Sequence, residues 1–382
     1  MMRVVFLTAI LTQYRIPFHE GVRARLSEAG IQYDVIFGQP GPAEATKADT
    51  EILSWGKQVI NRRFKIGRFS AIWQPALRDI WASDLAVIGQ ENRFLINYLV
   101  QTLRGFCRPK VALWGHGRNF QIQPDVGFAQ RWKRVWATQA DWWFAYTEAT
   151  REIVEGYGFP PERITVVHNT IDTSEIRRLV REVAASRLDA LRQRLDIKTN
   201  NVGVYVGGLY DYKRLDFLIE SAQEIRRHVP DFMLIVVGSG VDRHRIEAAA
   251  SRHAWIRYLG PLFGVEKVEI LRLGRVFMMP GLVGLAILDC AAAGLPIVTT
   301  AYPYHSPEIA YLEPGRNGLM IEDWQNPAAY AQGVLSVLRD DVLRAHLTQG
   351  ANEIATVCTM ERMVHCFCEG IFAALSAPKV KI

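Results

Sequence analysis

The chain has 382 residues, of which 49% are hydrophobic and 22% charged, a composition typical of an ordinary folded protein and not of a disordered one. This length exceeds what one hydrophobic core usually supports, so we expect two domains. No stretch approaches the roughly 20 apolar residues that a membrane-spanning helix needs, which argues against a helical integral membrane protein.

The first apolar run, residues 2–11, is expected to form a buried strand. Its only basic residue is Arg3, and the run passes directly into residues 12–15 without the small-residue cleavage site of a secretion signal. The five cysteines, an odd number with no CxxC pair, favour reduced thiols over a disulfide framework or a structural zinc site. We therefore expect a cytoplasmic protein.

Short β-rich apolar runs alternate with helical patterns along the whole chain, which predicts parallel sheets built from βαβ units. Residues 174–199 interrupt this alternation because they are highly charged and lack a strand pattern. We expect them to be helical and to belong to an interdomain connection. The predicted fold class is α/β, with two doubly wound domains and a cleft between them. The expected strands are Val4–Ala9, Tyr33–Phe37, Leu85–Ile88, Val111–Trp114, Trp142–Tyr146, Ile164–Val167, Val202–Val206, Met233–Val237, Ile256–Leu259, Val276–Met279 and Pro296–Thr299.

The excess of basic residues lies in the N-terminal part of the chain. Residues 1–150 carry 19 Lys and Arg against 12 Asp and Glu, a net +7, whereas residues 151–382 carry 26 against 27, a net −1. Two basic segments that also contain Phe or Trp, residues 62–68 and 131–134, fit an anionic membrane surface or a phosphate-bearing lipid, and equally a solvated surface. We find no nucleic-acid-binding motif, so no nucleic acid partner is expected.

Three loops that contain glycine follow strands of the second half, at the edge of a parallel sheet where α/β proteins bind ligands. In the first loop, Gly207 and Gly208 allow a ligand to approach the backbone, and the start of the next helix favours an anion. Lys213 suits a diphosphate and Arg214 adds a second cation, although a lysine at a helix start is commonly solvated. The other two loops are residues 238–240 and 280–284.

Three further side chains are candidates for substrate contacts. Asp289 is the single carboxylate of an apolar helix, so it needs hydrogen-bond donors, either substrate hydroxyls or a protein partner. His116 lies between two glycines at the end of a strand and could bind a sugar hydroxyl or a phosphate, or be structural. Glu308, in the segment His305–Glu308, could supply an acid. The sequence has no DxD triplet, no HExxH and no suitably spaced acidic cluster, so no metal is expected.

These segments, in this order and spacing, resemble the GT4 family of retaining glycosyltransferases, also called glycosyl transferases group 1. The resemblance covers nearly the whole chain. It is carried by Tyr14–Phe18, Trp114–Gly117, Val167–Asp172, Val206–Lys213, Gly238–Gly240, Pro280–Gly294 and Glu308–Gly318. The Pro-Gly-x-Val-Gly-Leu loop at residue 280 is similar to that of a branch involved in bacterial polysaccharide assembly.

The resemblance implies a GT-B fold, in which two Rossmann-like domains face a central cleft. It implies an acceptor-binding domain over residues 1–172, a connection over 173–200 and a nucleotide-sugar-binding domain over 201–350. A C-terminal helix within residues 351–382 would cross back to the first domain. The donor would be a UDP- or GDP-sugar, the acceptor a glycan or a lipid-linked glycan, and no metal or other cofactor would be required.

The resemblance also assigns roles to residues. Lys213 matches the diphosphate-binding lysine of the family, Asp289 the ribose-binding second glutamate of its E-x7-E pair, and His116 a histidine near the donor sugar. The expected catalytic residues are His116, Lys213 and Arg214. The expected donor-binding residues are Gly207, Gly208, Gly281, Val283, Gly284, Leu285, Asp289 and Glu308, and the expected acceptor-side residues are Tyr14, Arg15, Arg118 and Asn119.

The sequence departs from the family pattern at four places. Gly208 stands where the family has a phosphate-binding arginine, which Arg214 could replace. Gly281 stands where the family has the first glutamate of the pair, so its contact to the donor sugar is missing. The second glutamate is shortened to Asp289, and the glycine pair of the first loop is replaced by residues 12–15.

The expected activity is sugar transfer from a nucleoside-diphosphate donor to a hydroxyl, with retention of anomeric configuration, in surface-polysaccharide or lipid-linked glycan assembly. The enzyme would be cytoplasmic or peripheral on the inner face of the membrane. The alternative is a non-catalytic nucleotide-sugar-binding or scaffold subunit with the same fold, because two family contacts are missing. A dinucleotide-dependent oxidoreductase is disfavoured, since no G-x-G-x-x-G follows the first strand.

Overall fold

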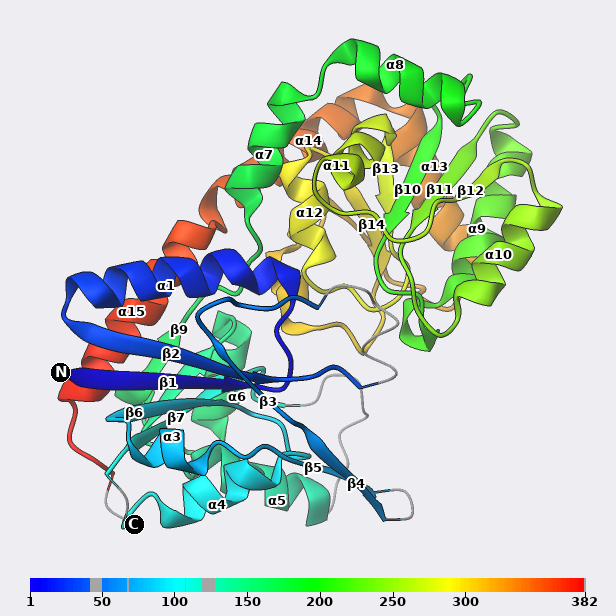
Figure 1. The fold of residues 1–382 in the computed structure, drawn as a ribbon. Helices are drawn as coiled ribbons and strands as arrows, with labels where there is room; N and C mark the ends of the chain where they lie inside the picture. The colour runs from blue at the N-terminus through cyan, green and yellow to red at the C-terminus, as the bar shows by residue number, and fades with distance from the viewer. Residues whose placement is uncertain (42–49, 67–68, 107, 119–127, 381–382) are drawn as a thin grey trace. The chain divides into compact units, whose positions relative to one another are not determined.

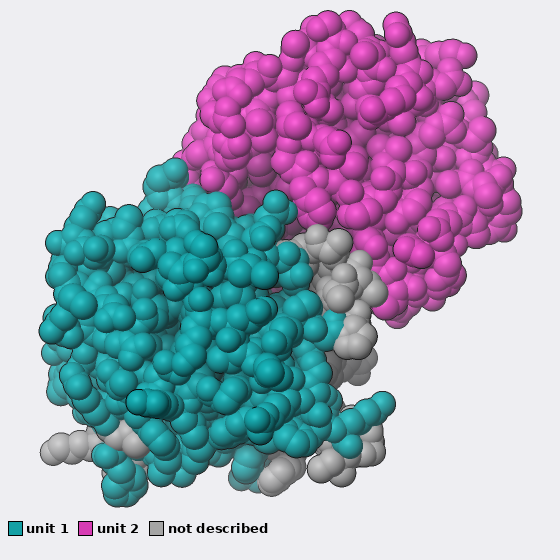
Figure 2. Space-filling model, in the orientation of Figure 1, with its two compact units in different colours: residues 1–45, 49–169, 360–382 teal, residues 46–48, 170–359 magenta. Residues whose placement is uncertain are grey.

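The computed structural model describes residues 1–41, 50–66, 69–106, 108–118 and 128–380. The chain forms two compact units, which Figure 2 shows in different colours. Unit 1 contains residues 1–45, 49–169 and 360–382, and unit 2 contains residues 46–48 and 170–359. The chain thus leaves unit 1 after residue 169 and returns to it at residue 360, whereas we expected domain boundaries at 172/173 and 350/351.

Unit 1 is built on a seven-stranded parallel sheet of order β3-β2-β1-β6-β7-β8-β9 (Figure 1). Its strands are β1 (Met2–Thr8), β2 (Ile31–Gly38), β3 (Lys57–Val59), β6 (Leu85–Gly89), β7 (Lys110–Gly115), β8 (Trp142–Ala145) and β9 (Ile164–Val166). A separate antiparallel hairpin is formed by β4 (Arg62–Ile66) and β5 (Phe69–Trp73). The helices of unit 1 are α1 (Ile16–Glu28), α3 (Leu77–Trp81), α4 (Leu95–Leu103), α5 (Phe128–Thr138), α6 (Glu148–Gly156) and α15 (Met360–Ser376).

Both faces of this sheet are buried, because alternate residues of each strand point to opposite sides. Val4 and Phe6 of β1 share a core with α1 and α15, whereas Val5 and Leu7 share a second core with α3 to α6. The C-terminal helix α15 therefore completes the covering of the N-terminal sheet.

Unit 2 is built on a six-stranded parallel sheet of order β12-β11-β10-β13-β14-β15. The strands are β10 (Val202–Val206), β11 (Met233–Val237), β12 (Ile256–Tyr258), β13 (Val276–Met278), β14 (Ile297–Thr300) and β15 (Gly318–Ile321). The helices are α7 (Thr173–Glu182), α8 (Ala185–Arg194), α9 (Leu215–His228), α10 (Arg243–Arg252), α11 (Gly264–Leu273), α12 (Ala286–Ala292), α13 (Pro327–Arg339) and α14 (Asp341–Val357). Two short 3₁₀ turns, η3 (Asp211–Lys213) and η4 (Pro307–Tyr311), lie in its loops.

The predicted α/β class with two doubly wound domains is confirmed, and every expected strand is present within one or two residues of its predicted ends. The charged segment 174–199 is helical as predicted, but it forms two helices, α7 and α8, because the backbone is extended at Val183 and Ala184. None of the described helices has the length and apolarity that a membrane span requires.

Candidate functional site

The strand order of unit 2 reverses between β10 and β13, because the chain runs outward from β10 to β12 and then returns to the other side. Loops that leave neighbouring strands in opposite directions open a crevice at their carboxyl ends, where ligands of doubly wound sheets bind. The loops after β10 and β13, residues 207–213 and 279–285, are the ones that flank this position. The topology therefore brings the loops that the sequence singled out to the position where ligands of such sheets bind.

The loops after β10 and β11 pack backbone against backbone. The Gly207 and Leu209 amides donate to the Val237 and Ser239 carbonyls at 3.0 and 2.9 Å. A Cβ atom at Gly238, whose φ is 144°, would lie 1.8 Å from the Gly207 carbonyl oxygen. At Gly240 it would lie 2.1 Å from the Leu209 oxygen. Only glycine allows the two backbones to approach so closely, so Gly238 and Gly240 determine how the two loops pack beside the candidate site.

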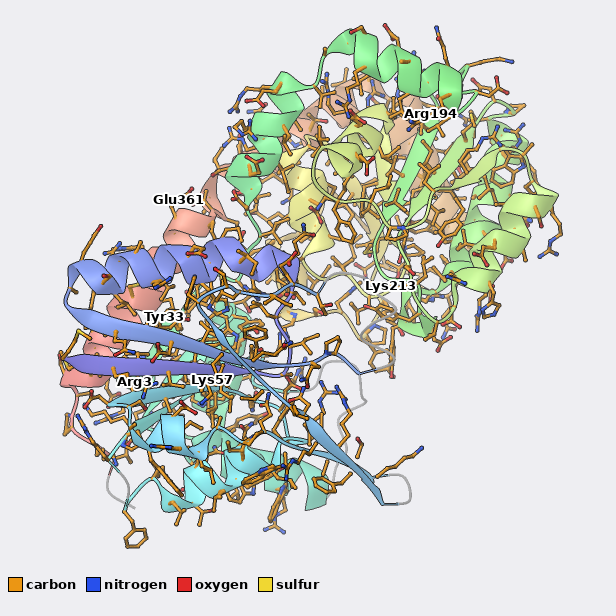
Figure 3. All side chains as sticks on the ribbon, in the orientation of Figure 1. Arg3, Tyr33, Lys57, Arg194, Lys213 and Glu361 are labelled. Carbon is orange, nitrogen blue, oxygen red and sulfur yellow. The ribbon has the colours of Figure 1, made fainter. Side chains whose placement is uncertain are left out.

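Lys213 ends η3 beside these loops, as Figure 3 shows, and it is only 5% exposed. Its ammonium donates to the Leu282 carbonyl at 2.5 Å and lies 3.7 Å from the Met279 sulfur. The ring of Tyr210 lies 5.6 Å away. The alternative reading of Lys213 as a solvated helix-start lysine is therefore wrong, since a lysine so deeply buried is rare without a specific role.

Arg214 follows in a left-handed backbone conformation, with φ 56° and ψ 51°, and caps the start of α9. Its guanidinium lies 4.0 Å from the Phe217 ring and 5.0 Å from the Trp324 ring, and it donates to the Trp324 carbonyl at 2.5 Å. Burial lowers the pKa of Arg214. These contacts give the side chain a packing role, and only its remaining N–H groups are available for a phosphate.

At the two glycines that stand where the family has larger residues, neighbouring groups occupy the space that a side chain would need. A Cβ atom at Gly208 would lie 2.5 Å from the Cε1 atom of Tyr210. At Gly281 it would lie 2.3 Å from the Tyr212 carbonyl oxygen and 2.6 Å from the Lys213 carbonyl carbon. Real Cβ atoms do not approach other atoms within 3.0 Å. Where the family has an arginine and a glutamate, this chain therefore packs the loop around Lys213 more closely.

Asp289 lies on α12, where its Oδ1 atom accepts a hydrogen bond from the Lys267 ammonium at 2.6 Å. The two side chains are 14% and 20% exposed. A protein partner for this carboxylate, which the sequence left open beside substrate hydroxyls, is thus present. The sequence did not identify it as Lys267, because that residue lies 22 positions away on another helix, α11. The bond takes one carboxylate oxygen and restrains where the other points.

His305 and Glu308 are both buried, with 7% and 2% exposure, and His305 lies next to the loop that contains Gly281 and Val283. The Nδ1 atom of His305 accepts from the Val283 amide at 2.9 Å, and its Nε2 atom pairs with the Thr300 carbonyl at 2.8 Å. Gly284 and Leu285 continue from this loop into α12. His305 was singled out from the sequence only as part of a segment, and its bonds are visible only in the fold.

Unit 1 brings its candidates together at the carboxyl ends of β1, β7 and β9. The Arg15 guanidinium donates to the Asn169 Oδ1 atom at 2.5 Å and lies 4.9 Å from the Tyr14 ring and 5.6 Å from the Trp114 ring. The ring of His116 lies 4.3 Å from that of Tyr146. These groups combine a cation, a histidine and aromatic faces, a mixture suited to polar ligands with ring faces.

The other two acceptor-side candidates are Arg118 and Asn119. Arg118 is exposed, and Asn119 lies outside the described residues. The described parts of the chain contain no group of three His, Cys, Asp or Glu side chains arranged to hold a metal ion.

Two family models match the chain, one in each unit. The model described as "Glycosyltransferase Family 4" matches residues 22–175, and the one described as "Glycosyl transferases group 1" matches residues 200–340. The second match contains every donor-side residue named above.

Curated relatives include the D-inositol 3-phosphate glycosyltransferase of Salinispora arenicola, which is 29% identical over 230 residues, or 56% of this chain and 50% of the relative. The phosphatidyl-myo-inositol mannosyltransferase of Mycobacterium tuberculosis is 28% identical over 156 residues, or 38% of this chain and 40% of the relative. The chain thus spans about half the length, or less, of the curated relatives it matches.

Among solved structures, the Anabaena protein Alr3699/HepE in complex with UDP superposes with a TM-score of 0.72 at 16% identity, covering 97% of this chain and all of that one. At this identity the likeness concerns the fold, which is GT-B. The two family models together match most of the chain, which therefore belongs to the GT4-type glycosyltransferases, glycosyl transferases group 1.

Proposed function

We propose that this chain transfers a sugar from a nucleoside-diphosphate donor to a hydroxyl acceptor, with retention of anomeric configuration and without a metal ion. The observation that carries the proposal is the buried Lys213 ammonium at the carboxyl edge of the second sheet, between the loops at its topological switch point. The names of the curated relatives support sugar transfer, and the UDP and UDP-glucose bound to the Anabaena protein support a nucleotide-sugar donor.

In this reaction the bond between the anomeric carbon and the diphosphate oxygen breaks, the acceptor oxygen bonds to that carbon, and the hydroxyl proton passes to the departing diphosphate. The Lys213 ammonium would stabilise the negative charge that develops on the departing diphosphate. The free oxygen of Asp289 would accept from a ribose hydroxyl, since Lys267 holds the other. The Val283 amide is already bonded to His305, so we expect other amides of this loop, such as those of Gly284 and Leu285, to bind the donor.

On the acceptor side, we propose that Tyr14, Arg15 and His116 of unit 1 bind a glycan or a lipid-linked glycan. Aromatic faces suit the apolar face of a sugar ring, and the Arg15 guanidinium suits an oxygen-rich group. The names of the two curated relatives, which refer to inositol acceptors, support a small polyol or glycan acceptor. Surface-polysaccharide or lipid-linked glycan assembly is the process that we propose.

Replacing Lys213 with methionine tests the donor site directly. We expect the variant to bind UDP or GDP more weakly by about 2–5 kcal/mol, because a buried charged contact to the diphosphate is lost. Isothermal titration calorimetry of both nucleotides measures this change. Lys198→Met is the matched control, since Lys198 is an exposed lysine of the same unit. Unchanged binding by the Lys213 variant, or no binding by the wild type at millimolar nucleotide, would contradict the donor assignment.

The second candidate function is a non-catalytic binding subunit, which the filled positions at Gly208 and Gly281 favour. It would bind the nucleotide without hydrolysing or transferring the sugar. Mass spectrometry of products formed from a panel of UDP- and GDP-sugars, with membrane extract as the source of acceptors, separates the two functions. Detection of a glycosylated product would exclude the non-catalytic one and would also identify the donor sugar.

We also propose that unit 1 binds an anionic membrane surface. Arg62, Arg63 and Lys65 are exposed on β4 around Phe64, which is 48% exposed. Figure 1 shows that this strand and β5 form a hairpin at the margin of the unit. Helix α5 adds Trp132 at 43% exposure and exposed arginines at positions 131 and 134. Basic groups beside exposed aromatic rings suit the boundary between lipid headgroups and acyl chains.

Sedimentation with phosphatidylserine vesicles tests this surface. We expect binding at low salt that weakens as salt rises, because about 1 kcal/mol per basic residue comes from attraction to anionic lipid. Phe64→Ser combined with Arg63→Ser should reduce the bound fraction, whereas Arg178→Ser on the second unit should not, since the excess of basic residues lies in residues 1–150. No sedimentation at any salt concentration would refute a membrane role for this face.

A further inference from the structure

We propose that His305 is a positioning residue for the donor diphosphate, which holds the loop after β13 so that this loop fixes the Lys213 ammonium. The inference rests on the proposed function. It assigns a role to a histidine that neither the family resemblance nor the comparisons single out.

The bonds of His305 fix its protonation state. The Val283 amide can only donate, so Nδ1 is an acceptor, and the Thr300 carbonyl can only accept, so Nε2 carries the proton. The ring is therefore neutral with one defined tautomer. Burial lowers the pKa of His305 to about 4, with a smaller opposing effect from the Thr300 hydrogen bond and a further lowering by the charge of Lys213. At neutral pH the imidazole bridges two backbone segments without adding a charge beside Lys213.

Every backbone polar group of Leu282 and Val283 has a protein partner. The Leu282 amide donates to the Tyr212 carbonyl at 2.8 Å, and the Leu282 carbonyl accepts from Lys213 Nζ at 2.5 Å. The Val283 amide donates to His305, and the Val283 carbonyl accepts from the Ser306 amide at 3.0 Å. These two residues therefore connect the His305–Ser306 segment on one side to the turn that carries Lys213 on the other.

This arrangement determines where the Lys213 ammonium can lie. A lysine side chain has four rotatable bonds and a compact charge, so its ammonium needs a fixed acceptor to stay in one position. The Leu282 carbonyl is one such acceptor, and its direction depends on the peptide that links Leu282 to Val283. The Val283 amide belongs to the same peptide unit and points at His305 Nδ1. Because a peptide unit is planar, the bond at Val283 orients the carbonyl that holds Lys213.

A purely structural histidine would fill space and satisfy polar groups without a specific link to phosphate. The two roles differ in their consequences for ligands. If His305 acts through Lys213, its loss should weaken the binding of a nucleoside diphosphate but leave the nucleoside unaffected. If it only supports the fold, both ligands should be affected alike, in proportion to the loss of stability.

The experiment compares three substitutions that retain different parts of the imidazole. His305→Asn retains an acceptor near the Nδ1 position, His305→Gln retains a donor near the Nε2 position, and His305→Leu retains neither. We expect the Gln and Leu variants to bind UDP at least about tenfold more weakly and the Asn variant to stay within about threefold of the wild type. Uridine affinity should stay within about twofold in all three. If the wild type prefers guanine nucleotides, GDP and guanosine replace UDP and uridine.

A double-mutant cycle with Lys213→Met adds a second readout. In the Lys213→Met background, His305→Gln should change UDP affinity by less than about twofold, because the group through which it acts is gone. Additive losses would overturn the proposal, as would equal loss of UDP and uridine binding or unchanged UDP binding by the Gln variant. Circular dichroism and thermal unfolding check each fold. If the Leu variant does not fold, the comparison of Asn with Gln decides.

This design separates the inference from the function on which it rests. If the wild type binds neither UDP nor GDP, the donor site itself is refuted. If the wild type and the Lys213→Met variant differ in UDP binding but the His305 variants match the wild type, the donor site stands and the role of His305 is refuted.

Discussion

Gly281→Glu is expected to weaken nucleotide binding at least about tenfold and to lower the free energy of unfolding of unit 2 by about 1–3 kcal/mol. This result is the opposite of what the family resemblance suggests, because glutamate is the residue that the family carries at this position. The reason lies in the space around the Cα atom of Gly281. The first atom of any side chain there would lie 2.3 Å from the Tyr212 carbonyl oxygen.

Two effects compete in this variant. A carboxylate near the Lys213 ammonium is attractive, and in a partly buried site such a pair can contribute on the order of 1–3 kcal/mol. The steric conflict acts on backbone atoms of Tyr212 and Lys213, which cannot rotate away as a flexible side chain can. The turn has to move, and its movement breaks the bonds from Leu282 to Tyr212 and from Lys213 to Leu282. The loss of these two bonds, together with the strain, outweighs the attraction.

Gly281→Ala separates sterics from charge, since it adds only the conflicting Cβ atom. It should show most of the same loss of stability. Gly284→Ala is the matched stability control in the same loop, because its Cβ atom would meet only the Ser306 side chain, at an ordinary 3.6 Å. Urea unfolding and calorimetric titration with UDP or GDP measure both effects. A Gly281→Glu protein that binds the nucleotide more tightly than the wild type would show that the loop opens more easily than this packing implies.

The sequence predicted the two sheets well because their central strands are apolar on both faces. A run such as Val202–Val206 is buried at every position, and no helical pattern competes with it. The strands that the sequence analysis missed are short or charged. β4 reads Arg-Arg-Phe-Lys-Ile, a surface segment by composition, and it pairs only with its hairpin partner. β15 has only four residues and begins at Gly318, so its apolar stretch of three residues, Leu319–Ile321, is too short to stand out as a strand.

The candidate site was predicted in position but not in detail. Its position follows from the rule that loops at the carboxyl ends of parallel strands bind ligands, and that rule needs only the strand order. The details depend on contacts between distant segments. Lys267 reaches Asp289 from another helix, Tyr210 covers Gly208, and His305 bonds to Val283 across 22 residues. No local sequence pattern predicts these contacts, because several different side chains at each position would be compatible with the same helix or loop.

Asp141→Ala is expected to lower the free energy of unfolding of unit 1 by about 3–5 kcal/mol. Asp141 is 3% exposed and lies 3.6 Å from the guanidinium of Arg104, which is 4% exposed. Its two oxygens also accept from the Val111 amide and from the Val380 amide, each at 2.9 Å. Removing the carboxylate leaves the buried Arg104 cation without its counter-charge and two backbone donors without their acceptor, and each such loss costs free energy.

The effect should extend to the C-terminal segment, because Asp141 joins the start of β8 to the tail that follows α15. The same tail is held by Lys379, which donates to the Arg104 carbonyl at 2.7 Å. Helix α15 covers one face of the first sheet, so release of the tail should expose the aromatic core around Phe367. Hydrogen exchange of the α15 amides should therefore accelerate in the Asp141→Ala protein more than exchange in unit 2.

Glu369→Ala is the matched control for this prediction. Glu369 lies on the same helix and pairs with Arg25 at 2.8 Å, but the two side chains are 54% and 38% exposed. An exposed pair of this kind contributes only about 0–1 kcal/mol, because water screens both charges. Chemical denaturation of both variants measures the difference. Equal losses of stability would mean that the buried carboxylate contributes no more than a surface one, and the fixed return of the C-terminal helix would then depend on the packing of its apolar face alone.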